Sequence, residues 1–587
     1  MSKKTNQKTF IAFLFFFFFL LSARVFAVDT EALKTEHRNL VVDTSGSTKM
    51  VIRAYEGLDL DADNLEAHLQ GTLNSKNPDF SIIRLVRILF FSDKYDDEIL
   101  PVLASFNYWL VKNEVDYSYN SENHLIMWMS SAWLLNQKYG WNVGGSTLEQ
   151  RLRHYLKLKL QYGFYEFNSP TYAPFTLAGL LNLADFAEDT EIRDNARLAA
   201  IKLLKQMMLY VNNKGAFFPV AGRSYGENYD SYWDSESGEY SPHMYNRIIY
   251  LTTGLGVKPV TCGSSSVFVA TSGVNFDEVA DSWSESFYTT FSSGHYMGDS
   301  KEVHAGLSRV DRTLFQWSAG GYFHPAVADD STYTADYYNI TEDQLAGYIT
   351  EMPNLPDWFS DLASKIGATL SRSSDISHHT AKIFKNKGVV LTSLKNFYTS
   401  YMGWQQWPVV ATCDDIAVWT QSGEVKTNWD DRSRNNANTH LPYLNQDENV
   451  VLIGYWPNFE ISSAGFFGAM DTDVAVYWPE DEFDETEEYR NWLIGRKNDS
   501  YIAVYRHTDD IKNGHYYSDS GRQLWAIVVG NEDMHGSYSN FVDIIKRAST
   551  TEEYYLSFYV PGMVYKIGVN VDGKNLSHRW TTDQKTA

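Results

Sequence analysis

Cysteine is almost absent from this chain, whose 587 residues include only Cys262 and Cys413. Two thiols allow one disulfide in an oxidising compartment, but the sequence gives no distance between them. They cannot form a thiolate zinc site by themselves, because such a site takes four ligands. The spacing of His378, His379 and His440 fits no known metal site either. We therefore expect no metal and no cofactor.

Positive charge is also in short supply. The chain has 50 lysines and arginines against 73 aspartates and glutamates, which gives a net charge of -23. Such a chain should not bind nucleic acid through its overall charge. A broad face for polyanions is disfavoured as well, although a local basic cleft is compatible with these numbers. The sequence further lacks a glycine-rich phosphate loop, a Gly-x-Ser-x-Gly elbow and a His-Glu-x-x-His helix, which removes the enzyme classes built on them.

Long hydrophobic runs are confined to the N-terminus. Lysines within the first eight residues precede an apolar run over residues 11–21, and Val25–Ala27 follow it. This order is typical of a secretory signal peptide, and the run is shorter than the about 20 residues of a membrane helix. We predict that residues 1–27 are removed and that the mature chain, beginning near Val28, has no stable membrane span and is secreted or periplasmic. An uncleaved N-terminal anchor is the alternative.

The first half of the remaining chain has helical patterning. Apolar residues recur at three- and four-residue spacing, which predicts amphipathic helices joined by short turns. These segments are 79–89, 98–111, 124–137, 147–161, 174–187 and 192–211. Serial helices of this kind form antiparallel hairpins. Because the sequence shows no strict repeat, we expect a toroid of hairpins rather than a regular solenoid.

The pattern changes after about Gly254. Residues up to about 375 are mixed, with a helical stretch over 342–369 that Pro353 and Pro356 interrupt. From His379 onward, short apolar runs alternate with clusters of Asn, Asp and Gly, which predicts strands. These runs lie at 389–392, 416–420, 450–455, 524–529, 554–559 and 564–571. Their spacing predicts a large antiparallel sandwich.

Together these patterns predict an α+β multidomain protein, since the chain is too long for a single core. We expect an N-terminal (α/α) toroid of helical hairpins over residues 28–375, with a mixed connecting region after about 255, and a C-terminal antiparallel β-sandwich over residues 376–587. Aromatic residues make up 15% of the chain. Most of them suit a core and a β-surface, although aromatic faces also stack on the apolar face of a pyranose in sugar-binding clefts.

Several polar segments between the predicted helices are candidates for a functional site. Residues 121–128 open a helix with an Asn-His pair behind a capping serine, an arrangement that also suits plain helix capping. Residues 163–174 form a proline-bounded loop, and residues 221–233 hold Arg223 among tyrosines and a tryptophan. Loops at the rim of a scaffold are where function collects, and an arginine there can bind a carboxylate.

Two of these segments resemble parts of a known enzyme class. Asn123 and His124, followed by an aromatic residue at Trp128, resemble the Asn-Asn-His helix of toroid-type alginate lyases. Residues 163–187 resemble the segment that carries the catalytic tyrosine of these enzymes, which here is Tyr172. The later β part resembles the sandwich of heparinase II/III-like and chondroitin-lyase-like proteins, which share a helical toroid. The resemblance implies a polysaccharide lyase.

The sequence departs from the alginate-lyase pattern in two places. Glu122 stands where those enzymes carry the first asparagine of the motif. No arginine lies in the segment around Tyr172, so Arg223 would have to supply that charge. The local agreement covers residues 121–187, whereas the agreement in architecture covers most of the chain.

The resemblance implies β-elimination on a uronate, with Asn123, His124, Tyr172 and Arg223 as catalytic residues. Asn123, with His124 or Arg223, would neutralise the substrate carboxylate. Tyr172 would take the C5 proton and protonate the leaving oxygen, alone or with His124. Because a tyrosine with an ordinary pKa near 10 is a poor base, a cation such as Arg223 would be needed beside it. The expected substrate-binding residues are Tyr119, Trp128, Glu166, Asn168, Tyr225, Tyr229 and Trp233.

Other functions are compatible with the sequence. Helical toroids also host glycoside hydrolases, which need two carboxylates. The same loops offer Asp116, Glu122, Glu166, Asp230 and Asp234 for that role. The acidic net charge suits a neutral glycan better than a uronate. A non-catalytic glycan-binding surface protein is the remaining alternative to the predicted secreted lyase.

Overall fold

The computed structural model describes residues 28–340 and 375–581, apart from short internal gaps. The gaps are 45, 47, 113–118, 225–232, 235–238, 241–242, 323, 396, 398–404, 423–439, 457–472, 508–510, 513–514, 519–520 and 558–561. The expected signal peptide and the helical stretch expected over 342–369 lie outside the described residues. None of the described helices is long and apolar enough to cross a bilayer.

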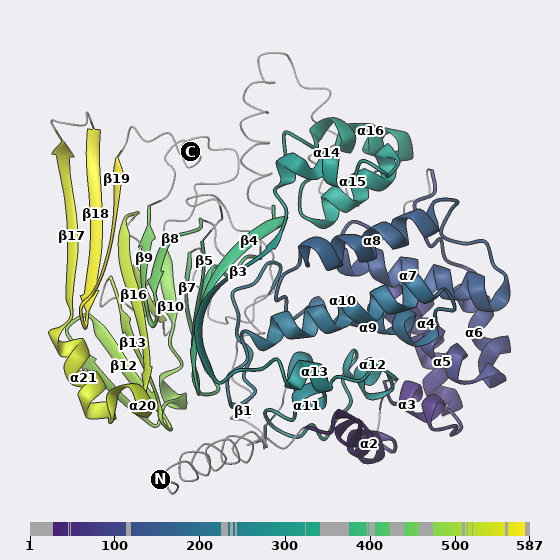
Figure 1. Cartoon of the computed structure of the whole chain (residues 1–587), viewed down its shortest axis with the longest axis horizontal. Helices are drawn as coiled ribbons and strands as arrows, with labels where there is room; N and C mark the ends of the chain where they lie inside the picture. Colours follow the sequence, from purple (N-terminus) through teal and green to yellow (C-terminus); the bar gives the residue numbers. More distant parts are fainter. Residues whose placement is uncertain are drawn as a thin grey trace, which may run out of the picture.

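Helices dominate the described chain up to Tyr338 and form the layer on the right of Figure 1. The longer series is α2 (Thr30–Val41), α3 (Lys49–Tyr55), α4 (Ala62–Leu73), α5 (Asp79–Phe91), α6 (Asp96–Leu103), α7 (Glu122–Tyr139), α8 (Leu148–Tyr162), α9 (Ala173–Phe186) and α10 (Thr190–Met208). Shorter helices follow: α11 (Met244–Thr253), α12 (Ser266–Ala270), α13 (Asp277–Ala280), α14 (Ser300–Val303), α15 (Arg309–Ser318) and α16 (Ala328–Tyr338). The helical first half is therefore confirmed, whereas its closure into a toroid stays a prediction.

The predicted helical segments match the structure except at one end. The segment predicted over 98–111 is wrong in length, because α6 ends at Leu103. The hydroxyl of Tyr108 donates to the carbonyl of Leu103 at 3.0 Å and so satisfies a C-terminal carbonyl that the next helical turn would have used. Helices α2 to α4 precede the first predicted segment, and α12 to α16 lie in the region expected to be mixed.

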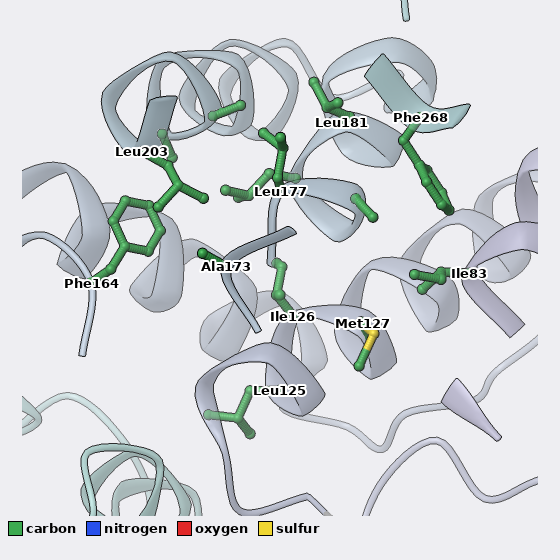
Figure 2. Close-up of a cluster of buried hydrophobic side chains, with 14 of the residues drawn as sticks. Ile83, Leu125, Ile126, Met127, Phe164, Ala173, Leu177, Leu181, Leu203 and Phe268 are labelled. Atoms are coloured by element: carbon green, nitrogen blue, oxygen red, sulfur yellow. The ribbon is translucent and has the colours of Figure 1, made fainter. Parts of the chain in front are cut away.

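The helical core centres on α7 and α9. Leu125, Ile126 and Met127 are consecutive and fully buried, which shows that α7 is covered on all sides. Figure 2 shows their side chains among those of the neighbouring helices. Gly179 of α9 permits this packing, because a Cβ there would lie 3.2 Å from Ile126. The segment with the Asn-His pair thus opens a helix that is fixed along its length.

The second half forms antiparallel sheets. One sheet has the order β14-β15-β10-β7-β6-β5-β4-β3, a second has β11-β12-β13-β16-β9-β8, and a small third sheet has β17-β18-β19. The strands of the first sheet are β3 (Ser286–Gly294), β4 (His378–Asn386), β5 (Val389–Leu394), β6 (Val409–Cys413), β7 (Ile416–Ser422), β10 (Val474–Tyr477), β14 (Ile511–Lys512) and β15 (His515–Ser518). The others are β8 (Tyr443–Asp447), β9 (Val450–Tyr455), β11 (Glu485–Tyr489), β12 (Trp492–Lys497), β13 (Ser500–Tyr505), β16 (Gln523–Asn531), β17 (Ser549–Ser557), β18 (Gly562–Val571) and β19 (Lys574–Thr581).

The layers stack across the molecule, as Figure 1 shows. Successive residues of β5 alternate between two cores: Val390 packs with the helical layer and Leu391 packs between the two large sheets. The eight-stranded sheet is therefore covered on both faces at its centre, where every residue of β5 and β6 is buried. Beyond the six-stranded sheet, α21 (Tyr538–Arg547) and the three-stranded sheet cover its outer face. The predicted antiparallel sandwich is confirmed.

Two details of the fold bear on the sequence predictions. Strand β3 lies in the mixed connecting region and pairs along its length with β4, so the large sheet begins before residue 376. Cys262 and Cys413 are both free thiols, and the possible disulfide is not formed. The packing of the layers, rather than a cross-link, holds the two halves together.

Candidate active site

The Asn-His pair lies in the first turn of α7. Ser121 has an extended backbone and its hydroxyl accepts from the amide of His124 at 3.4 Å, so it caps the helix as expected. The same hydroxyl donates to Oδ1 of Asn123 at 2.5 Å. The other side-chain atom of Asn123, Nδ2, is buried and has no hydrogen-bond partner among the described residues. Ser121 therefore both caps the helix and orients the Asn123 side chain.

Asp79, at the start of α5, holds the His124 ring. Its Oδ2 lies 2.5 Å from Nδ1 of His124, and Asp79 is itself buried. Phe80 packs edge-on against the imidazole, with ring centroids 5.2 Å apart. A carboxylate on Nδ1 fixes the orientation of a histidine ring and leaves its Nε2 side for other chemistry.

Glu166 joins the Asn-His turn to the arginine segment. Its Oε2 accepts from the amide of Asn123 at 3.1 Å, and its Oε1 accepts from Nη1 of Arg223 at 3.0 Å. Burial raises the pKa of Glu166, whereas the Arg223 guanidinium and the nearby His124 oppose that rise. Because Glu166 is buried and both its oxygens have protein partners, it positions other residues instead of binding substrate as expected from the sequence.

Arg223 occupies a constrained place between several groups. Its backbone has φ of +64°, and its Nη2 donates to the hydroxyl of Tyr322 at 3.2 Å. Burial alone would lower the pKa of this arginine, but Tyr322, Glu166 and Tyr172 nearby raise it above its ordinary value. The guanidinium therefore stays charged next to Tyr172.

Ser169 brings Tyr172 and Arg223 together through the backbone. Its hydroxyl donates to the carbonyl of Arg223 at 2.6 Å and accepts from the amide of Tyr172 at 3.0 Å. Tyr172 is half-buried at the start of α9. Glu166 thus links the Asn-His turn to the Arg223 side chain, and Ser169 links the backbone of Tyr172 to that of Arg223.

A second buried carboxylate supports the loop that carries Glu166. Glu122 accepts from the amides of Tyr165 at 3.0 Å and Glu166 at 2.8 Å, and it forms an ion pair with Lys159 of α8. The Lys159 ammonium also lies 3.8 Å from the centre of the Tyr165 ring. Burial lowers the pKa of Lys159, and the Glu122 carboxylate opposes that shift. The departure from the alginate-lyase motif at Glu122 therefore has a structural role.

The large sheet closes the other side of the site. His379 of β4 stacks on the ring of Phe167, with centroids 3.6 Å apart, and the amide of Gly222 donates to the carbonyl of Phe167 at 3.1 Å. The hydroxyl of Tyr165 lies 2.6 Å from Nε2 of His295, which follows β3. Burial lowers the pKa of His295. The site thus lies where the helical layer meets the eight-stranded sheet.

The expected substrate-binding residues divide by location. Tyr119 and Trp128 are buried and pack on each other with ring centroids 5.3 Å apart, so both are core residues and the expected stacking on a sugar is wrong for them. Asn168 is also buried, and its Nδ2 donates to the carbonyl of Val220 at 3.0 Å. Tyr225 and Tyr229 lie outside the described residues. Trp233 lies in β1 (Trp233–Asp234), which pairs with β2 (Glu239–Tyr240), and its side chain is not described.

Some members of the site were not predicted from the sequence. Asp79, Lys159, Tyr322 and His295 each contact a predicted site residue or its loop. Lys159 had a detectable signal, because it falls on the buried face of α8, one turn after Tyr155. Within the described part of the chain, no three His, Cys, Asp or Glu side chains lie together as a metal site would require.

Comparisons with known proteins identify no family. No protein-family model matches the chain, and no curated protein matches it. Among solved structures, it is similar to the crystal structure of heparinase III, with 11% sequence identity and a TM-score of 0.33. That alignment covers 91% of this chain and 82% of the heparinase chain. The functional argument accordingly rests on the contacts of the site itself.

Proposed function

We propose that this chain is a polysaccharide lyase that cleaves a uronate-containing glycan by β-elimination. The observation that supports the proposal is that Glu166 bonds to both the Asn123 amide and the Arg223 guanidinium, with His124 close to Glu166 and Tyr172 close to Arg223. An amide donor, an imidazole, a phenol and a guanidinium are the groups that this reaction needs. Asn123 and His124 begin a helix, whereas Tyr172 and Arg223 belong to two other segments. Local structure alone would therefore not bring these residues together.

Asn123 supports the binding of a carboxylate. A buried amide donor left without an acceptor costs about 1–3 kcal/mol, and Nδ2 of Asn123 is in that position among the described residues. A uronate carboxylate at this point would remove that cost and would gain a neutralising partner. The Nε2 side of the adjacent His124 ring would face the same substrate, since Asp79 holds its Nδ1 side.

Tyr172 and Arg223 support the proton transfers. The arginine charge favours the phenolate form of a neighbouring tyrosine, and the phenolate can then take the C5 proton. The electrons of that C–H bond form a C4=C5 double bond as the C4–O bond breaks. The phenol of Tyr172 returns the proton to the leaving oxygen, which completes the elimination without water.

The glycoside hydrolase alternative has less support. Glu122 and Glu166 are both buried and both bind backbone amides and a cation of the protein itself. Carboxylates used in this way are not placed on either side of a glycosidic bond, as hydrolysis requires. Asp116 and Asp230 lie outside the described residues, and the side chain of Asp234 is not described.

Product analysis with a Tyr172→Phe variant tests the proposal. On a panel of uronate glycans, the wild type should release products with a new ultraviolet-absorbing double bond. Tyr172→Phe should lower turnover by roughly 100-fold or more, because it removes one hydroxyl and keeps the ring. Tyr555→Phe, at an exposed position on β17, is the matched control and should leave turnover unchanged.

The same experiment separates the alternatives. New reducing ends without a double bond would show a hydrolase, and binding of the glycan without any product would show a binding protein. Turnover of Tyr172→Phe within threefold of the wild type would exclude Tyr172 as the proton-transfer residue. Unfolding midpoints of all variants should agree closely, because packing of the ring is kept.

A further inference from the structure

Helix α16 carries a pair of exposed tyrosines, Tyr333 and Tyr337, which we call the α16 tyrosine platform. They are four residues apart and so share one face of the helix. Their ring planes differ by 15° and their centroids lie 6.0 Å apart. Each side chain is well exposed, at 42% and 45%, although large aromatic rings are more often buried. Two aligned exposed rings are the arrangement that stacks on consecutive sugars.

A cation lies over each ring of the platform. The Arg309 guanidinium is 4.3 Å from the centre of Tyr333, and the Lys112 ammonium is 4.9 Å from the centre of Tyr337. Arg309 is held in place by Asp330, whose Oδ1 accepts from Nε at 2.9 Å. Asp330 also binds Arg312, so one buried carboxylate orients two arginines.

The platform is tied to the candidate active site through two segments. The hydroxyl of Ser331 in α16 donates to the carbonyl of Tyr322 at 2.8 Å. The hydroxyl of Tyr322 in turn accepts from Arg223 and donates to the carbonyl of Asn120, both at 3.2 Å. Lys112 belongs to the segment that leads to Asn120. The helix that carries the platform and the segment that carries Lys112 are therefore both connected to the site.

The spacing suits an extended ligand. Tyr333 and Tyr337 lie about 3 and 9 Å farther along the axis of α16 than Ser331, at about 1.5 Å per residue. Figure 1 shows α15 and α16 at the upper edge of the helical layer, beside α8. The two rings are about 6 Å apart along the helix axis, so they can contact successive residues of an extended chain.

We propose that the α16 tyrosine platform is a secondary subsite that binds sugar residues of an acidic polysaccharide outside the reacting pair. The rings stack on pyranose faces, and Arg309 and Lys112 pair with carboxylates of the chain. The cations select an acidic glycan over a neutral one, because a neutral chain gains only the stacking. The proposal rests on the proposed function for the class of its ligand, but it concerns binding and not turnover.

Affinity electrophoresis in native gels tests the platform. The probes are alginate and hyaluronan as acidic chains and dextran as a neutral chain. We expect the double variant Tyr333→Ala/Tyr337→Ala to weaken binding of at least one acidic chain by fivefold or more, and Lys112→Ala to weaken it by twofold or more. Retardation by dextran should be small for the wild type and for every variant, because stacking alone binds a neutral chain weakly.

Tyr554→Ala is the matched control for the double variant. Tyr554 is a similarly exposed tyrosine, at 48%, with the Arg522 guanidinium 3.5 Å from its ring centre, but it lies on β17 at the far end of the molecule. Among the residues that the structure describes, no ring lies parallel to Tyr554 as Tyr337 lies parallel to Tyr333. Its substitution should leave the affinity for all three polymers unchanged. An equal loss in Tyr554→Ala and in the double variant would overturn the proposal.

The assay distinguishes failure of the subsite from failure of the proposed function. If the double variant binds alginate and hyaluronan as the wild type does, or if the wild type binds neither, the subsite is excluded whatever the turnover. If the double variant loses affinity while no lyase product ever forms, the subsite stands and the proposed function fails. Thermal unfolding of the variants should match the wild type, since the substituted side chains are exposed.

Discussion

The interior of the helical layer and the interior between the two large sheets contain different kinds of side chain. Between the sheets, apolar side chains such as Leu391, Ile502 and Val504 form a cluster, and a buried polar contact there joins two neutral hydroxyl groups, those of Thr420 and Tyr455. Around the candidate site the buried set includes Glu122, Lys159, Glu166 and Arg223. Moving each charge out of water costs several kcal/mol of desolvation free energy, which attraction to its partner only offsets. A chain that can build an apolar core in one half does not need this network for stability in the other, which supports a role in positioning functional groups.

Removing one member of the charged interior should have the largest effect on stability. Lys159→Met keeps the length of the side chain but leaves the Glu122 carboxylate buried without its cation. We expect the free energy of unfolding to fall by about 3–5 kcal/mol, the usual cost of breaking a buried pair from one side. Denaturant titration of the two proteins measures this difference.

The neighbouring position supplies the control for this variant. Leu158→Met changes a buried apolar residue of the same helix and should cost less than about 1.5 kcal/mol. Adding Glu122→Gln to Lys159→Met should recover part of the loss, because no unpaired charge is then left in the interior. Equal losses in Leu158→Met and Lys159→Met would show that packing, not charge, explains the effect.

Lys385 of β4 lies at the boundary between the two interiors and should make stability depend on pH. It is fully buried, and its Nζ donates to the carbonyls of Met208 and Val211, both at 2.9 Å. Burial lowers its pKa from 10.5 to about 7. Between these values the unfolded chain binds more protons than the folded chain, so the free energy of unfolding rises as pH rises.

Comparison with Lys385→Met isolates this contribution. From pH 7 to pH 9 the free energy of unfolding of the wild type should rise by roughly 2 kcal/mol more than that of the variant, because methionine at position 385 does not titrate. The measurement is denaturant unfolding of both proteins at the two pH values. Parallel pH dependence of the two proteins would mean that Lys385 stays charged in the folded state.

The sequence predicts the apolar interior better than the charged one. Strands such as β5 and β16 are visible as short apolar runs because both their faces are buried. Local motifs point to the Asn-His turn and Tyr172 as candidates, but they do not reveal Lys159, because a lone charge in a helix ordinarily faces solvent. Trp128 shows the opposite error: it was expected to bind sugar but is buried, because a motif beside an aromatic residue does not reveal whether the ring packs inward. Pairings between distant segments, such as Glu166 with Arg223, follow only from the fold.

The smallest expected effect comes from adding one polar atom to the apolar interior. Val504→Thr in β13 keeps the shape of a fully buried side chain and replaces a methyl group with a hydroxyl. We expect a loss of roughly 1 kcal/mol, in the lower part of the range for a buried hydroxyl, because a neighbouring ladder carbonyl can accept a second hydrogen bond. The same change at Val260, which is 61% exposed, should alter stability by less than about 0.5 kcal/mol. Turnover and glycan binding should not change in either variant, because Val504 packs among the apolar residues between the sheets and Val260 is exposed. A neutral result at Val504 would mean that the sandwich accommodates polar groups as readily as the helical layer does, and the buried charges around Glu166 would then lose their value as a sign of function.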